Sequence, residues 1–270
     1  LDEAGEPQPG PQLTTEDWFE SAVSRFDEAL NANPTETLRH LIAMGKARAL
    51  LNLGRYDQAA TAASGVPTAW EYLIRMSSNS NRQENALANL STQRRAWSVA
   101  DGEGGNGMGF RAPDPRVPWI ESDEPWDRSE PVQYQQLKFP DTEAPIVLAS
   151  GIEARLIEAE AALRDGVVDT WLEKLNEARA TVAMDPLGDP GSEAARVDLH
   201  FSERARWFFG DGHRLGDLRR LVRQYGRDAE DVFPSGEYRK GGVYGTDVNW
   251  IITELEENNP HFTGCLDRDA

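Results

Sequence analysis

Two prolines 33 residues apart bracket the segment that most constrains the fold. Between Pro34 and Pro67, the helical sequence is interrupted at Gly54. Glycine adopts the left-handed backbone conformation that ends a helix more readily than other residues do. Gly54 therefore predicts the end of one helix, and Tyr56 lies where the next begins. A period close to 34 residues is typical of repeated helix pairs.

The residues around these positions resemble a tetratricopeptide repeat. Ala29 to Pro34 is similar to the end of the repeat's second helix, and Leu53 to Ala59 is similar to the turn between its two helices. In such a turn, Tyr56 and Ala59 enter the groove between the helices. We interpret residues 15–67 as a helix pair of this kind, within tetratricopeptide-like helices over 14–95.

The start of the first helix is marked by a cap. Thr14 is followed three residues later by Asp17, which is the spacing of a capping box. The residues before it, 1–13, are acidic and rich in proline and glycine, and they predict a flexible arm. Beyond the cap, apolar residues recur on one helical face. These are Trp18, Ala22, Phe26, Ala29 and Leu30.

The character of the chain changes between residues 96 and 145. Glycines cluster between residues 102 and 109, and prolines recur from 113 to 145. We therefore expect a long irregular excursion here, with short strands around 132–139. Loops of this length inside compact domains are usually functional or disordered. Aromatic rings in polar, proline-rich surroundings can stack on a sugar. The candidates are Trp97, Trp119, Trp126 and Tyr134. Alternatively, the same rings fasten the excursion to the helices.

Helical patterning returns at about Ile146 and continues to Ala180, with a turn at Gly166. A proline- and glycine-containing loop then leads to a further helical region, Glu193 to Tyr225, in which Gly210 and Gly212 permit a sharp turn. The last 45 residues are rich in loop-forming sequence.

Charged residues of both signs alternate at near-helical spacing in the region from Glu203 to Arg220. They predict a structural network of buried, hydrogen-bonded charges, and the alternative is a clamp for an anion or a sugar. The members are Glu203, Arg204, Arg206, Arg214, Asp217 and Arg219.

This region also resembles a known family. Glu203 to Arg220, together with Ile152 to Ala161 and Leu175 to Arg179, resembles the SusD/RagB family of nutrient-uptake outer-membrane lipoproteins. The stretch from Trp250 to Pro260 is similar to that family's closing segment. The resemblance implies a mostly α, SusD-like fold with tetratricopeptide-like helices, and a non-catalytic protein that works with a TonB-dependent transporter.

The sequence departs from the family pattern at several points. The family is typically about twice as long, and its lipidated cysteine at the mature N-terminus has no counterpart near Leu1. Asp211 stands where the family usually has glutamate, and Ile252 where it usually has proline. These departures weaken the expectation of a lipid anchor and of the family's ligand site.

Composition excludes several other classes. With 46 acidic and 28 basic residues, the net charge is −18, which disfavours nucleic acid as a partner. The sequence contains no run of about eighteen apolar residues, which a transmembrane helix would need. Cys265 is alone, and the four histidines lack paired metal spacing. The glycines at 102, 104 and 107 satisfy a dinucleotide-binding pattern, but Pro113 and Pro115 follow where that motif needs a helix.

We therefore predict an exported, non-catalytic protein of the cell envelope, without cofactor or metal. Residues 14–270 form a single SusD-like domain in this interpretation. Its predicted function is to bind a glycan or other nutrient and to cooperate with a TonB-dependent transporter. The alternative is a SusD-like structural or accessory subunit that stabilises a larger membrane complex, respiratory or photosynthetic for example, without binding a ligand.

Overall fold

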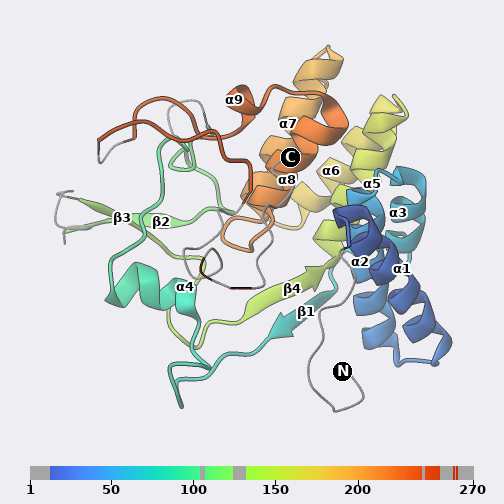
Figure 1. Cartoon of the computed structure of the whole chain (residues 1–270), viewed down its shortest axis with the longest axis horizontal. Coiled ribbons are helices and arrows are strands. Elements are labelled where there is room, and N and C mark those ends of the chain that lie inside the picture. The colour runs from blue at the N-terminus through green and yellow to red at the C-terminus, as the bar shows by residue number, and fades with distance from the viewer. Residues whose placement is uncertain are drawn as a thin grey trace. The chain divides into compact units, whose positions relative to one another are not determined.

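A computed structural model describes residues 13–103, 107–123, 132–238, 241–249, 258 and 260 (Figure 1). The chain divides into two compact units. Unit 1 consists of Leu1–Tyr72 and Ala149–Asp189, and unit 2 of Leu73–Leu148 and Pro190–Ala270. The single domain expected over 14–270 stays a prediction. The predicted arm, Trp126 and Cys265 lie outside the described residues.

Unit 1 is a stack of helices in which sequence neighbours pack as antiparallel pairs. Helix α3 also packs on α5, although the two lie far apart in sequence. The described helices are α1 (Thr15–Asn31), α2 (Glu36–Asn52), α3 (Tyr56–Ala63), α5 (Gly151–Arg164) and α6 (Val168–Ala180). Their core joins Met44 and Leu50 of α2 to Ala59 of α3 and Ile157 of α5. The mostly α, tetratricopeptide-like fold class is therefore confirmed.

The same turn ends the first helix of two successive pairs. Gly54 has φ +71° and Gly166 has φ +73°. After α2, the amide of Gly54 donates to the Leu51 carbonyl at 3.0 Å and that of Arg55 donates to the Leu50 carbonyl at 2.9 Å. This double closure is the Schellman motif, which satisfies carbonyls that the helix end would otherwise leave without donors.

The start of α1 agrees with the sequence, but its apolar face does so only in part. Thr14 and Asp17 form the predicted capping box, with the Asp17 amide donating to the Thr14 hydroxyl at 3.1 Å. Phe26 is half-buried, whereas Trp18 is 64% exposed. Helical periodicity identifies a face of a helix, but it does not show how far along that face a neighbour packs.

Two strands carry the chain between the units. Strand β1 (Glu71–Ile74) pairs with β4 (Ile146–Ser150), and Figure 1 draws them side by side. The expectation of helix from Ile146 is wrong, because α5 begins only at Gly151, behind an N-cap at Ser150. Ile146 and Val147 are β-branched, and such side chains favour a paired strand. The tetratricopeptide-like helices likewise end at Ala63 rather than continuing to residue 95.

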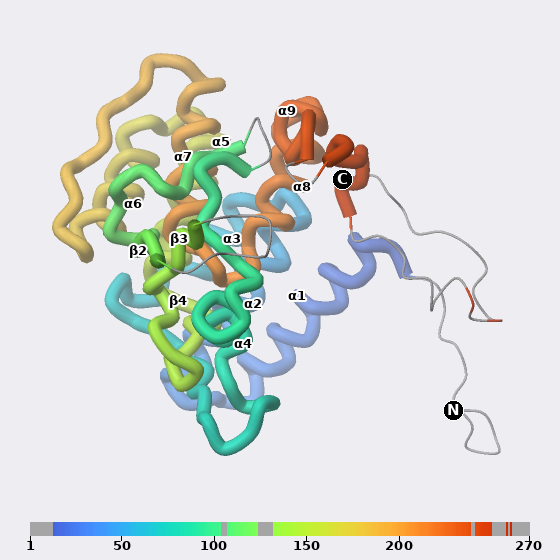
Figure 2. Tube along the Cα trace, turned by 90° about the vertical axis from the view of Figure 1, so that its left-hand side faces the viewer, coloured from blue at the N-terminus to red at the C-terminus, as the bar shows by residue number. Residues whose placement is uncertain are grey.

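Unit 2 combines helices with the irregular excursion. In the excursion, β2 (Trp119–Ser122) pairs antiparallel with β3 (Gln133–Gln136). Strand β3 lies where short strands were expected, whereas β2 was not predicted. The coil of α4 (Ala86–Ala88) and the π-helical η1 (Asn89–Gln93) is seen from the side in Figure 1 and near its axis in Figure 2. Helices α7 (Glu193–Trp207), α8 (Arg214–Tyr225) and α9 (Ala229–Val232) follow.

The turn between α7 and α8 also follows the prediction. Gly210 and Gly212 have φ +76° and +82°, so both adopt the conformation that glycine permits. Within the described residues, no helix is long and apolar enough to cross a membrane.

At Gly151 the backbone of α5 lies against the backbone of residues 67–70. The Gly151 amide donates to the Trp70 carbonyl at 2.7 Å, and a β-carbon there would lie 1.9 Å from the Pro67 carbonyl oxygen. We predict that Gly151→Ala lowers the free energy of unfolding by about 3 kcal/mol, because backbone atoms cannot yield as a side chain does. Urea denaturation measures the change. Gly65→Ala is the control, since no atom lies within 4 Å of its β-carbon position; equal stability losses in the two variants would contradict the prediction.

Candidate ligand-binding pocket

Arg116 fastens the irregular excursion to α7. Its guanidinium donates to both carboxylate oxygens of Glu203, at 2.6 and 3.1 Å, and to both oxygens of Asp114, at 2.8 and 2.7 Å. The three side chains are almost fully buried, with exposed fractions of 3% for Arg116, 4% for Glu203 and 9% for Asp114. Bidentate pairs of this kind fix orientation as well as distance.

A second buried cluster joins α7 to α8. Asp217 accepts from Arg204 Nε at 3.0 Å and Nη2 at 2.9 Å, and from Arg220 Nη2 at 2.9 Å. All three side chains are buried. Each guanidinium also lies near an aromatic ring, Arg204 over Phe208 at 5.0 Å and Arg220 over Phe201 at 5.2 Å. The two helices are therefore connected through one carboxylate.

The surroundings of these carboxylates determine their protonation. Burial alone would raise the pKa of Asp217, but the charges and hydrogen bonds of Arg204 and Arg220 outweigh it and lower that pKa. Burial likewise opposes ionisation of Asp114, yet hydrogen bonds from Arg116 and the charges of Arg116 and Arg206 lower its pKa. Both carboxylates are therefore ionised at neutral pH.

The other members of the predicted network lie at the edge of these clusters. Arg206 lies 3.4 Å from an Asp114 oxygen, and Arg214 pairs with Glu103 at 2.5 Å. Arg219 is half-buried on α8. Sequence reasoning missed Arg116, Asp114 and Arg220, and the missing signal is intelligible for the first two. They lie in a proline-rich stretch without periodicity, so nothing local indicates that they reach α7.

Three of the four predicted aromatic residues meet in one cluster, and the fourth, Trp126, lies outside the described residues. Trp97 stacks on Phe209, with ring centroids 5.6 Å apart and planes at 22°. Trp119 meets the edge of Tyr134 at 5.4 Å. Both tryptophans and Tyr134 are partly buried against Val99, Phe110, Val117, Ala205 and Phe209. In this cluster the rings pack the excursion against α7, and a sugar-stacking role for them stays a prediction.

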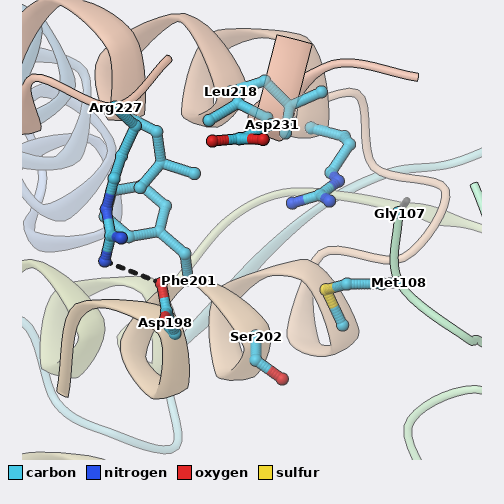
Figure 3. Close-up of a pocket in the computed structure, with 11 residues that line it drawn as sticks. Gly107, Met108, Asp198, Phe201, Ser202, Leu218, Arg227 and Asp231 are labelled. Atoms are coloured by element: carbon cyan, nitrogen blue, oxygen red, sulfur yellow. Dashed lines mark hydrogen bonds and ion pairs between the residues drawn. The ribbon is translucent and has the colours of Figure 1, made fainter. Parts of the chain in front are cut away.

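A pocket of about 340 Å³ opens beside this framework, among α7, α8, α9 and the glycine-rich stretch. In Figure 3, Asp198, Phe201 and Ser202 lie on one side of it and Leu218 and Asp231 on the other, with Met108 at the margin. Gly107, Arg214, Leu221, Arg227 and Val232 complete the lining. The volume is at the low end of small-molecule sites, which span roughly 300–1,000 Å³.

Polar and apolar side chains both line this pocket. Arg227 spans the left side of Figure 3 to reach Asp198 at 2.8 Å, and it also donates to the Ala194 carbonyl at 3.0 Å. Arg214 donates through Nε and Nη2 to Glu103. By contrast, the Asp231 carboxylate makes no hydrogen bond or ion pair with the described residues of the chain. The lining thus offers oriented donors, acceptors and one carboxylate open to a ligand.

Metal chemistry gains no support from the arrangement of side chains. In the parts of the chain that the structure describes, no group of three or more histidine, cysteine, aspartate or glutamate residues is placed to hold a metal ion.

Comparison of the structure with solved proteins decides the fold. A SusD-like protein from Bacteroides fragilis matches with a TM-score of 0.55 over 82% of this chain, at 16% sequence identity. The chain has a SusD-like fold. A SusD-like carbohydrate-binding protein from Bacteroides vulgatus matches over 74% of the chain, with a TM-score of 0.50 and 16% identity. Surface glycan-binding protein A from Bacteroides uniformis matches over 82%, with a TM-score of 0.50 and 14% identity.

At 14–16% sequence identity, the match to these three solved structures is one of fold. No protein-family model matches the sequence, and no curated protein is similar to it. The chain spans 63%, 50% and 61% of the lengths of the three SusD-like and glycan-binding structures, in the order given.

The buried clusters generate a stability prediction. We expect Glu203→Ala to lower the free energy of unfolding by about 3 kcal/mol, because it leaves the buried Arg116 with only one of its two carboxylates. Chemical denaturation at pH 7 measures it. Glu28→Ala, in an exposed pair with Arg25, is the control and should cost less than about 1 kcal/mol. A shift in melting temperature of only a degree or two for Glu203→Ala would contradict the role of this pair.

The lowered pKa of Asp217 predicts how stability depends on pH. Its folded-state pKa lies below the unfolded value of about 3.9, so its contribution is complete above that value and is lost as pH falls through the folded pKa. We expect Asp217→Asn to be less stable at pH 7 and to lose less stability than the parent between pH 5 and 2. Urea titrations across this range measure it, with the exposed Asp57→Asn as control. Parallel profiles for Asp217→Asn and the parent would rule out this contribution.

Proposed function

We propose that this protein captures a carbohydrate without changing it chemically, and that the pocket among α7, α8 and α9 holds it. The observation that carries the proposal is a pocket of about 340 Å³, lined by both polar and apolar side chains, on a SusD-like fold. Two proteins with similar folds are described as a carbohydrate-binding and a surface glycan-binding protein.

The lining matches the surface chemistry of a sugar. A sugar ring presents hydroxyl groups around its edge and C–H groups on its faces. Arg227, which donates to Asp198 at 2.8 Å and to the Ala194 carbonyl at 3.0 Å, places donors beside an accepting carboxylate, while Met108 and Leu218 supply apolar contact area. Oriented polar groups on a mostly apolar surface are the general pattern of small-molecule sites.

We further propose that capture takes place at the cell envelope and that the ligand passes to a TonB-dependent transporter. Support for this part comes from the sequence resemblance to the SusD/RagB family and from the similar fold of a surface glycan-binding protein. The transporter is a proposed partner of this chain. In this mechanism the protein contributes binding and release, and the chemistry of the ligand stays the same.

A second candidate function is that of an accessory subunit in a larger membrane complex. One observation favours it. Trp97, Trp119 and Tyr134, which the sequence suggested for sugar stacking, are partly buried in a packing cluster. In that case the protein co-purifies in fixed stoichiometry with a multi-subunit complex and fails to retain any glycan.

Calorimetric titration of the purified chain with a panel of neutral and acidic oligosaccharides tests capture. We predict saturable binding of at least one of them, and a loss of about tenfold or more in affinity for Arg227→Ala. That variant removes the donor that Asp198 and the pocket edge position. Arg25→Ala, which breaks an exposed pair with Glu28, is the matched control and should bind normally. The proposal fails if no oligosaccharide binds, or if Arg227→Ala and Arg25→Ala bind equally well.

A further inference from the structure

The charges around the pocket are unevenly satisfied. Arg227 is paired with Asp198 at 2.8 Å, and Arg214 is paired with Glu103 at 2.5 Å. Each guanidinium therefore already faces a carboxylate. Asp231 also lines the pocket, and its carboxylate has no partner of its own among the described residues. Among the residues that the structure describes, the pocket lining and its partner Glu103 together carry one uncompensated negative charge.

This arrangement discriminates between classes of sugar. A sugar that bears a carboxylate or sulfate needs a cation for that group, since placing a charge in a partly enclosed site is costly without a partner. Both guanidiniums are engaged, so an acidic sugar would have to displace Glu103 from Arg214 or Asp198 from Arg227. Displacing Glu103, whose side chain is only 21% exposed, leaves a partly buried carboxylate without its cation, whereas Asp198 is 67% exposed and is solvated by water when displaced. Asp231 repels an acidic ligand in both cases.

Neutral hydroxyl groups meet no such obstacle. A hydroxyl donates to the Asp231 carboxylate and accepts from a guanidinium nitrogen, without breaking an ion pair. The net charge of −18 acts in the same direction at longer range, because it lowers the local concentration of anions.

We propose that the pocket selects neutral sugars over acidic ones, and that Asp231 and the Arg214–Glu103 pair enforce this selection. The inference rests on the proposed carbohydrate capture and adds the chemical class of the ligand. It assigns Asp231 to ligand selection and Glu103 to the masking of the Arg214 charge.

Matched sugars that differ only at C6 test this selection. The probes are the methyl glycosides of glucose, galactose and mannose and the corresponding hexuronates, with binding to the full chain followed by saturation-transfer NMR and calorimetry. We expect the best neutral glycoside to bind roughly tenfold more tightly than its uronate. Coulomb energies at pocket distances support a difference of this order.

Two charge-altering variants separate the local charges from the net charge. Asp231→Asn should reduce the ratio of hexose affinity to uronate affinity several-fold. Asp57→Asn, which removes the same charge from an exposed site in unit 1, should leave this ratio unchanged. Glu103→Gln, by unmasking Arg214, should raise uronate affinity to at least that of the hexose. Circular dichroism verifies that each variant is folded.

The outcomes distinguish this inference from the proposed function. Binding of the uronate as tight as or tighter than that of the hexose in the parent chain overturns the selection and leaves carbohydrate capture intact. If the ratio of hexose affinity to uronate affinity is unchanged in both Asp231→Asn and Glu103→Gln, the roles assigned to these residues are overturned. Absence of binding by every sugar, neutral or acidic, overturns the proposed function and this inference with it.

Discussion

The guanidinium of Arg116, held between two carboxylates, is the interaction on which the organisation of unit 2 depends. Asp114 belongs to the same proline-rich stretch as Arg116, so their pair shapes that stretch locally, while Glu203 connects it to α7. A buried guanidinium is costly unless its donors are satisfied, and here each of its three nitrogens donates to a carboxylate. The packing of Trp97 on Phe209 follows the same connection, because both place the excursion against α7.

The position of the excursion matters because its residues form one wall of the pocket. Gly107 and Met108 line it, and Arg214 reaches from α8 to Glu103 at the start of the glycine-rich stretch. The opposite walls come from helices that Asp217 joins through two arginines. The pocket therefore forms where two separately stabilised parts of unit 2 meet. Ion pairs with Glu103 and Asp198 orient its two arginines, Arg214 and Arg227.

Features of the fold and of the pocket could be predicted from the sequence where they depend on neighbouring residues, and not where they depend on residues far apart in the chain. The cap at Thr14 and the turns at Gly54 and Gly166 depend on a few neighbouring residues, and the structure confirms all three. The strand at Ile146 was missed, although Ile146 and Val147 are β-branched, because a short apolar run directly before a helix also fits the start of that helix. Its partner, β1, lies more than seventy residues earlier. The pocket draws on several segments between residues 107 and 232, and only tertiary packing brings them together. The charged segment from Glu203 to Arg220 was visible in sequence, but the identity of its partners was not.

The pairing of β1 with β4 has a consequence for how the chain tolerates change in length. These strands lie at the two ends of the intervening sequence, and they hold those ends side by side at the edge of a helical core that includes Ala63 before it and Ala149 after it. The entropy of closing such a loop grows only with the logarithm of its length. Segments can therefore be inserted or deleted between the strands at small thermodynamic cost to the helices. Evolution can therefore rebuild the excursion, which supplies Gly107 and Met108 to the pocket, while the helix pairs, and the turns that end them, keep their geometry.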